Sequence, residues 1–190
     1  GSSAAALGMA ISHALRSDLI PITKPYIDNL RNVLEATVVL ELLSGNVILT
    51  GYVAEGPPPV RLIGHVGDIV PNHASASAKA ILAFSSPQTR KRLINEKEMV
   101  RFTPKTITDP GELLSQWDKI KRQGFSVDDE ETGVGVRAIG APIFNHERTP
   151  FAAVVVTGPT QKISGKSGSL EVRHLKETAA RISRALHSPV

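Results

Sequence analysis

Apolar residues recur at helical spacing in two stretches near the N-terminus. Residues 7–16 read as a short amphipathic helix that has little to pack on within itself, which is typical of a connector. Residues 23–36 read as a second helix that faces a core, with Pro25 tolerated in its first turn. The apolar stripe of the first helix is Leu7, Ile11, Ala14 and Leu15, and that of the second is Ile27, Leu30 and Leu34.

The spacing then changes to that of β-strands. β-Branched residues fill the segments 37–43 and 46–53, and Ser44-Gly45-Asn46 between them has the chemistry of a hairpin turn. These segments predict two antiparallel strands. The run Gly56-Pro57-Pro58-Pro59 forbids regular pairing and predicts a loop, after which VRLIGHV, residues 60–66, predicts a short strand ahead of Pro71.

Three helical segments follow. Residues 73–84, HASASAKAILAF, predict a helix whose first turns carry small side chains, and an exposed continuation is expected around residues 87–95. The segment 109–124 has a complete local signature, with Asp109 as N-cap, Pro110 at the first helical position, Glu112 in a capping box and Gly124 as terminator. Its predicted buried stripe is Leu113, Trp117 and Ile120.

The C-terminal third predicts a second hairpin and a closing helix. Residues 134–144 and 151–157 form the hairpin strands around the turn NHERT. The last helix has its apolar stripe at Val172, Leu175, Ala179, Ile182 and Leu186. Two hairpins, a separate strand and helices at both ends predict an α+β fold with a mainly antiparallel sheet covered by helices.

Composition narrows the class of protein. A chain of 190 residues with 41% hydrophobic content can bury one core and hardly two. The low aromatic content of 4% argues against a stacking surface for single-stranded nucleic acid. The absence of cysteine excludes disulfides, thiolate metal sites and cysteine nucleophiles, and fits a cytoplasmic location. No segment approaches the ~20 apolar residues of a membrane span, and no signal peptide is evident, so we expect a soluble, unexported protein.

Four consecutive carboxylates, Asp128 to Glu131, raise the question of a metal or catalytic site. Consecutive acids diverge on a strand or turn, and the six histidines form no HxH or HxxxH pair, so we expect no metal site and no cofactor. At most one of Asp128 and Asp129 can face inward. We expect Glu130, Glu131 and one aspartate at a solvated corner, with the other aspartate overlooking a pocket floored by the hairpin strands.

The segment HASASAKA, residues 73–80, has two interpretations. A helix that opens with Ala and Ser lets a ligand approach its backbone, and the unpaired N–H groups of its first turn favour an anion. The physical suggestion is that amides near Ala76 and Ser77 bind a carboxylate. Equally, small residues allow close packing of a helix on a sheet, and the sequence alone does not decide between the two.

Five segments together resemble a known family. They are LGMAISHALR, PNHASASAKAILA, TPKTITDPGELL, IKRQGFSVDDEETGVGVRAIGAPIF and FAAVVVTGP. In this order and spacing the chain, from about Leu7 to Leu186, is similar to the effector-binding half of the IclR-type transcriptional regulators. The resemblance implies a GAF-like fold, in which a curved antiparallel sheet with helices on its outside forms a pocket for a small organic acid.

The resemblance also assigns roles to residues. Ala76 and Ser77 match the family's anion-contacting turn, and Asp128 matches an acid that faces the effector. The matching cavity-lining positions are Val136, Ala138, Val155 and Thr157. Val155 replaces a more polar residue of the small-acid binders and Ala138 a bulkier one. These changes predict a roomier, more apolar pocket that accepts an aromatic or longer acid.

The resemblance organises the chain into three parts. Residues 1–6 are expected to be a remnant of cloning with a disordered start, residues 7–20 a connector helix, and residues 21–190 the effector-binding domain. We expect this chain to lack the family's N-terminal winged helix-turn-helix, so operator DNA would be contacted only through that missing domain. The resemblance further implies a homodimer or tetramer, a cytoplasmic location and no enzymatic activity.

Two alternatives compete with this reading. The first is a stand-alone GAF-like sensor module from another signalling protein; a basic helix-turn-helix encoded upstream would favour the transcriptional regulator over it. The second is a hydrolase that uses Asp128 with His65 or His73 as acid and base. No GxSxG, HExxH or paired-acid motif supports the hydrolase.

Overall fold

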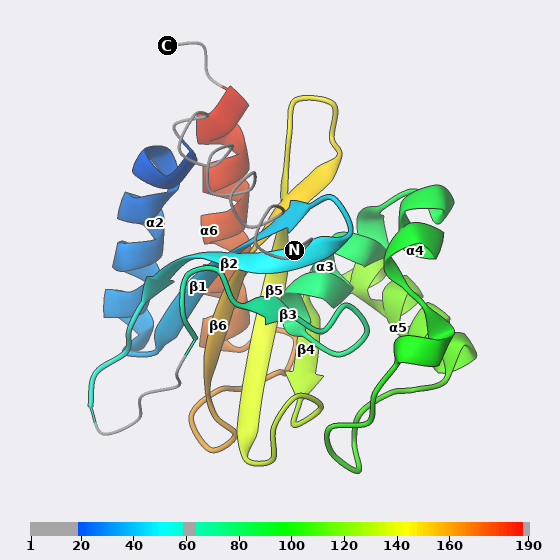
Figure 1. Ribbon diagram of the computed structural model, residues 1–190. Coiled ribbons are helices and arrows are strands. Elements are labelled where there is room, and N and C mark those ends of the chain that lie inside the picture. The colour runs from blue at the N-terminus through cyan, green and yellow to red at the C-terminus, as the bar shows by residue number, and fades with distance from the viewer. Residues whose placement is uncertain (1–18, 59–63, 188–190) are drawn as a thin grey trace.

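A six-stranded antiparallel sheet forms the centre of the computed structural model, which describes residues 19–58 and 64–187 (Figure 1). The strand order is β3-β2-β1-β6-β5-β4, and every neighbouring pair is antiparallel. The strands are β1 (Thr37–Ser44), β2 (Val47–Ala54), β3 (Ile69–Val70), β4 (Ser126–Asp129), β5 (Val136–Phe144) and β6 (Pro150–Pro159). The predicted α+β class with a curved antiparallel sheet between helices is confirmed.

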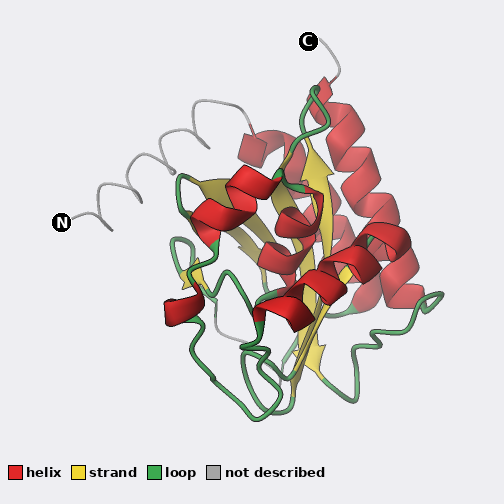
Figure 2. Cartoon of the chain, turned by 90° about the vertical axis from the view of Figure 1, so that its right-hand side faces the viewer, coloured by secondary structure: helices red, strands yellow, loops and turns green. Residues whose placement is uncertain are grey.

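Helices cover both faces of this sheet (Figure 2). On one face α2 (Leu19–Leu34) and α6 (Leu170–His187) pack against each other and against the central strands. On the other face α3 (Ala76–Phe84) lies on β4, β5 and β6, and α5 (Pro110–Gln123) packs on α3. The short α4 (Pro87–Leu93) and the 3-10 turn Glu96–Glu98 connect α3 to α5.

The alternation of side chains along each strand divides the core into two layers. On β1, Val38, Leu40 and Leu42 belong to the large cluster under α2 and α6. Val39 and Glu41 alternate with them and therefore lie on the α3 face. Since β1 is buried on both faces for most of its length, its sequence is an almost continuous apolar run.

The small side chains of α3 allow it to lie very close to the sheet. A Cβ atom added at Gly140 would come within 2.9 Å of the backbone oxygen of Ala76. The Ser126 hydroxyl donates a hydrogen bond of 2.5 Å to the same oxygen. The close-packing interpretation of this helix is therefore correct, and whether its N-terminus also binds an anion is a separate question.

The local signals of α5 and both hairpins predicted the structure well. The Asp109 carboxylate accepts a hydrogen bond from the Glu112 amide at 2.8 Å. Gly124 adopts the left-handed conformation, with φ of 81°, and its amide donates to the Ile120 carbonyl. Leu113, Trp117 and Ile120 are buried as expected. The four strands of the two predicted hairpins, the helix around residues 87–95 and the closing helix are also present.

Two predictions about local structure were wrong. Residues 59–63 lie outside the described residues, but the rest of the strand expected at 60–66 is a turn in which the Asp68 carboxylate accepts from the His65 amide at 2.7 Å. The strand instead comprises Ile69 and Val70, which pair with β2. Pro25, expected in a first turn, lies inside α2, because that helix already begins at Leu19.

The remaining predictions about the N-terminus concern residues that are not described. Residues 1–6 and most of the predicted connector, residues 7–18, lie outside the described part of the chain. Of the predicted connector, only Leu19 and Ile20 are described, and both belong to α2. Within residues 19–58 and 64–187, no helix combines the length and apolar character needed to cross a membrane.

Candidate functional site

Strand register brings most of the predicted pocket residues onto one face of the sheet. Asp128 pairs with Ala138, and Ala138 pairs with Thr157, so these three side chains lie side by side across β4, β5 and β6. Val155 and Val136 lie two residues away along their strands and therefore project from the same face. This is the face that α3 covers.

The N-terminal end of α3 lies against this row of residues. Ala76, Ala138 and Val155 form one apolar cluster with Val39 of β1. Ala76 thus meets two of the predicted lining residues directly, while Val136 and Thr157 are half-buried. The structure therefore brings together residues that are far apart in the sequence and that the family resemblance had grouped.

Two amides at the start of α3 are free of internal hydrogen bonds. Ser75 is the N-cap, and its hydroxyl and carbonyl oxygens accept from the amides of Ala78 and Lys79. Within the part of the chain that the structure describes, the amides of Ala76 and Ser77 have no hydrogen-bond partner. Unpaired amides at a helix start, together with the positive end of the helix dipole, favour an anion.

Asp128 has a structural role that the sequence did not reveal. Its carboxylate accepts hydrogen bonds from the amides of Glu131 and Thr132, at 2.7 and 3.2 Å, and from the Thr132 hydroxyl. The side chain is 2% exposed, and burial raises its pKa. The carboxylate therefore holds the turn after β4, in which Glu130 has a positive φ of 62°. A contact between Asp128 and an effector stays a prediction.

A buried ion pair explains another of the four consecutive acids. Lys79 is a fully buried residue of α3. Its ammonium group contacts the Glu131 carboxylate and donates to the Val127 carbonyl at 2.5 Å. Glu131 is 4% exposed, so its expected place at a solvated corner was wrong. The physical reason is Lys79, because a buried ammonium group requires a counter-charge.

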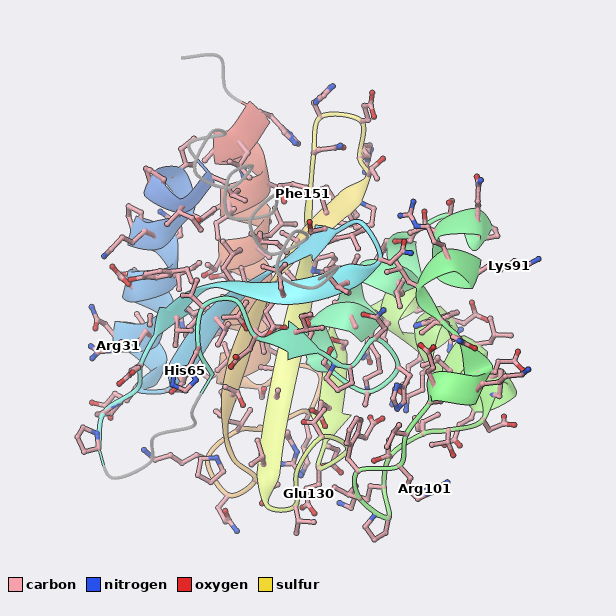
Figure 3. The ribbon with its side chains drawn as sticks, in the orientation of Figure 1. Arg31, His65, Lys91, Arg101, Glu130 and Phe151 are labelled. Carbon is pink, nitrogen blue, oxygen red and sulfur yellow. The ribbon has the colours of Figure 1, made fainter. Side chains whose placement is uncertain are left out.

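The other two acids lie on the outside. Asp129 pairs with Arg137 at 2.7 Å and with Lys105 at 3.3 Å, and its side chain is about half exposed. Glu130 lies at the loop end of the sheet, at the edge of the molecule (Figure 3). The prediction that at most one of Asp128 and Asp129 faces inward is confirmed.

One site residue, Glu41 of β1, was missed by sequence reasoning. It lies on the α3 face and is 8% exposed, and the hydroxyls of Ser77 and Thr50 interact with its carboxyl group. Burial raises its pKa to about 7. The signal was present in TVVLELL, where one acid interrupts an apolar strand that is buried on both faces.

The geometry gives no support to a hydrolytic or metal centre. His73 Nε2 lies 2.9 Å from the Val100 carbonyl oxygen, and the ring stacks on Phe102. His65 is exposed and lies 3.6 Å from Asp68. Both histidines proposed as partners of Asp128 are thus engaged elsewhere. Among residues 19–58 and 64–187, no group of three or more His, Asp or Glu residues could hold a metal ion.

Comparison with known proteins agrees with the fold. The family described as bacterial transcriptional regulator IclR C-terminal matches residues 12–184. This chain belongs to the IclR family. Its relatives in the IclR family are transcriptional regulators and not enzymes.

Individual relatives place the chain within the family. BhcR of Paracoccus denitrificans, an HTH-type transcriptional regulator, is 35% identical over 78% of this chain. The chain spans about half the length of BhcR, 53%. The structure of IclR from Thermotoga maritima superposes with a TM-score of 0.83 at 31% identity, over 96% of this chain and 74% of that one.

A more distant structural neighbour carries a ligand. It is a double mutant of the inducer-binding domain of PobR from Acinetobacter, in complex with 3-hydroxybenzoic acid. The TM-score is 0.75 at 21% identity, over 86% of this chain and 96% of that one, which establishes the shared fold.

Proposed function

We propose that this chain is the effector-sensing domain of an IclR-family DNA-binding regulator and that it binds a small organic acid at the N-terminus of α3. The observation that carries the proposal is the pair of unpartnered amides at Ala76 and Ser77, which lie against the sheet face that holds Ala138 and Val155. An acid would place its carboxylate at these amides and its apolar part over the strands.

The favoured ligand is an aromatic or longer acid. Ala138 and Val155 are small and apolar. They provide no polar side chain for a two- or three-carbon acid, and they leave more room than such an acid would fill. The inducer-binding domain of PobR, which shares this fold, binds an aromatic acid, and this supports the choice of aromatic probes. Thr157, half-buried at the end of the same row, would supply a hydroxyl donor to the ligand.

In the intact regulator, the acid would act on operator DNA through an N-terminal helix-turn-helix domain. A ligand that prefers one arrangement of the two domains changes operator affinity by a coupling free energy of about 1–3 kcal/mol, or about 5–150-fold. The proposed setting is a cytoplasmic homodimer or tetramer, as the family resemblance implies.

A thermal-shift panel tests the binding step. The probes are benzoate, 3-hydroxybenzoate and pyruvate, and the aromatic acids are expected to raise the melting temperature more than pyruvate does. Thr157→Val keeps the shape of the side chain and removes the hydroxyl. Loss of one hydrogen bond to a charged group is expected to weaken binding by about tenfold or more.

The matched control is Thr149→Val, because Thr149 is exposed in the loop between β5 and β6. The control is expected to bind as the wild type does. If none of the acids stabilises the domain, the proposed function is wrong. If Thr157→Val and Thr149→Val bind equally well, the site does not lie on this face of the sheet.

A further inference from the structure

Glu41 occupies an unusual position for an acid. It lies on β1, one of the two central strands, and pairs with Thr50 on one side and Ala153 on the other. Directly before it the register between β1 and β2 shifts, so that the pairing moves from Tyr52 to Thr50. The shift leaves Thr50 beside Glu41 on the face that α3 covers, where the Ser77 hydroxyl also reaches the carboxyl group.

No positive charge compensates this carboxyl group. The nearby ammonium group, that of Lys79 on α3, pairs with Glu131 in the turn after β4. The charge that acts on Glu41 belongs to another acid, Asp128 of β4, and it disfavours ionisation of Glu41. Among the described residues, Glu41 forms no ion pair, and the groups that favour its ionised form are the hydroxyls of Ser77 and Thr50.

We propose that Glu41 is a specificity-determining residue of the effector site, which selects monocarboxylates and binds them together with one proton held on the Glu41 carboxyl group. The inference rests on the proposed function, because it requires an organic acid at the start of α3. The link between the two groups is Ser77, whose amide is one of the two free donors and whose hydroxyl contacts Glu41.

The chemistry follows from the charges around the site. A neutral carboxyl group can donate its O–H to the ligand's carboxylate, alongside the amides of Ala76 and Ser77. An ionised Glu41 has no proton to donate and repels the anion. Since burial already raises the pKa of Glu41 to about 7, an anion bound nearby raises it further, and binding takes up a proton above neutral pH.

The same charges discriminate against dicarboxylates. Asp128 and Glu131 contribute two negative charges near the site and Lys79 one positive charge, so the surroundings are negative even when Glu41 is neutral. A second carboxylate on the ligand would therefore have no partner among these groups. Isophthalate, which adds one carboxylate to benzoate, is expected to bind at least about tenfold more weakly than benzoate.

The test measures the dissociation constants of benzoate, 3-hydroxybenzoate and pyruvate from about pH 6 to about pH 8 by calorimetry. For a group with a pKa near 7, the dissociation constant in the wild type is expected to rise about tenfold over this range. Glu41→Gln, which cannot lose a proton, is expected to abolish this dependence. Glu112→Gln, at an exposed acid of α5, is the matched control and retains it.

Carbon-13 NMR of the glutamate carboxyl groups provides a second readout in the wild-type protein, so the test does not depend on the folding of a variant. The Glu41 resonance is expected to titrate near neutral pH and to move to higher pH when a probe binds. An acid that binds without either pH effect overturns the role of Glu41 and leaves the proposed function standing. If no acid binds, the proposed function and this inference fail together.

Discussion

The buried ion pair between Lys79 and Glu131 gives the sharpest prediction about stability. The Lys79 side chain is 0% exposed and that of Glu131 is 5% exposed. Replacing Lys79 by Met keeps much of the volume and leaves the Glu131 carboxylate buried without its counter-charge. Breaking a buried pair in this way is expected to cost about 3–5 kcal/mol.

The size of the effect makes it easy to measure. For a chain of this length, a loss of about 3–5 kcal/mol corresponds to a fall in melting temperature of about 6–20 °C. Urea unfolding can be followed by the fluorescence of Trp117, the single tryptophan, which lies on α5 and is buried in a cluster with residues of α3. The double variant Lys79→Met, Glu131→Leu removes both charges and is expected to recover most of the lost stability.

An exposed lysine provides the control. Lys91 projects from α4 away from the body of the molecule (Figure 3). Lys91→Met is therefore expected to change the free energy of unfolding by less than about 0.5 kcal/mol. A Lys79→Met protein within about 1 kcal/mol of the wild type would refute the reasoning. So would a double variant that is no more stable than Lys79→Met alone.

Three further predictions concern packing, pH and capping. Gly140→Ala places a Cβ atom 2.9 Å from the Ala76 carbonyl oxygen and is expected to cost about 1–3 kcal/mol, measured by urea unfolding; unchanged stability would contradict the close approach of α3. Burial raises the pKa of Glu41 to about 7 from 4.5, so between these two pH values the folded state holds a proton that the unfolded chain has lost, and stability is expected to fall by about 3 kcal/mol as pH rises through this range. Urea titrations over the same pH range should show a shallower fall in stability for Glu41→Gln than for the wild type, and parallel curves would argue against the shifted pKa. Asp109→Ala removes the N-cap of α5 and is expected to lower the free energy of unfolding by about 1 kcal/mol, whereas Ser115→Ala on the exposed face of the same helix should have little effect.

Local sequence signals predicted the elements whose ends are fixed by their own residues. α5 begins with the Asp109 cap and ends with the left-handed Gly124, and both features need no distant partner. The two hairpins are equally local, since a short turn joins strands that pair with each other. β3 could not be predicted in the same way. It has two residues at the edge of the sheet, and its pairing with β2 depends on a turn at residues 65–68.

The charged groups of the site were the hardest to predict, because their environment is made by distant residues. Glu131 is buried because it pairs with Lys79, which lies 52 residues earlier in the chain. Asp128 was expected to face the site, and the sequence did not show that its carboxylate also binds its own turn. Glu41 was overlooked because alternation along β1 places it inward only once the sheet is known to be covered on both faces.

The pairing of β1 with β6 has a consequence for how the chain is made. Thr37 pairs with Thr157, so during synthesis β1 cannot pair with its second neighbour, β6, until most of the chain has been made. At about 5–20 residues per second on the ribosome, that delay is about 6–24 s. Pulse-labelling hydrogen exchange during refolding should find β1 protected together with β6 and later than α5. Until then an apolar strand with one open edge is available to other chains, so aggregation during biosynthesis, rather than unfolding afterwards, is the main hazard that this sheet order creates.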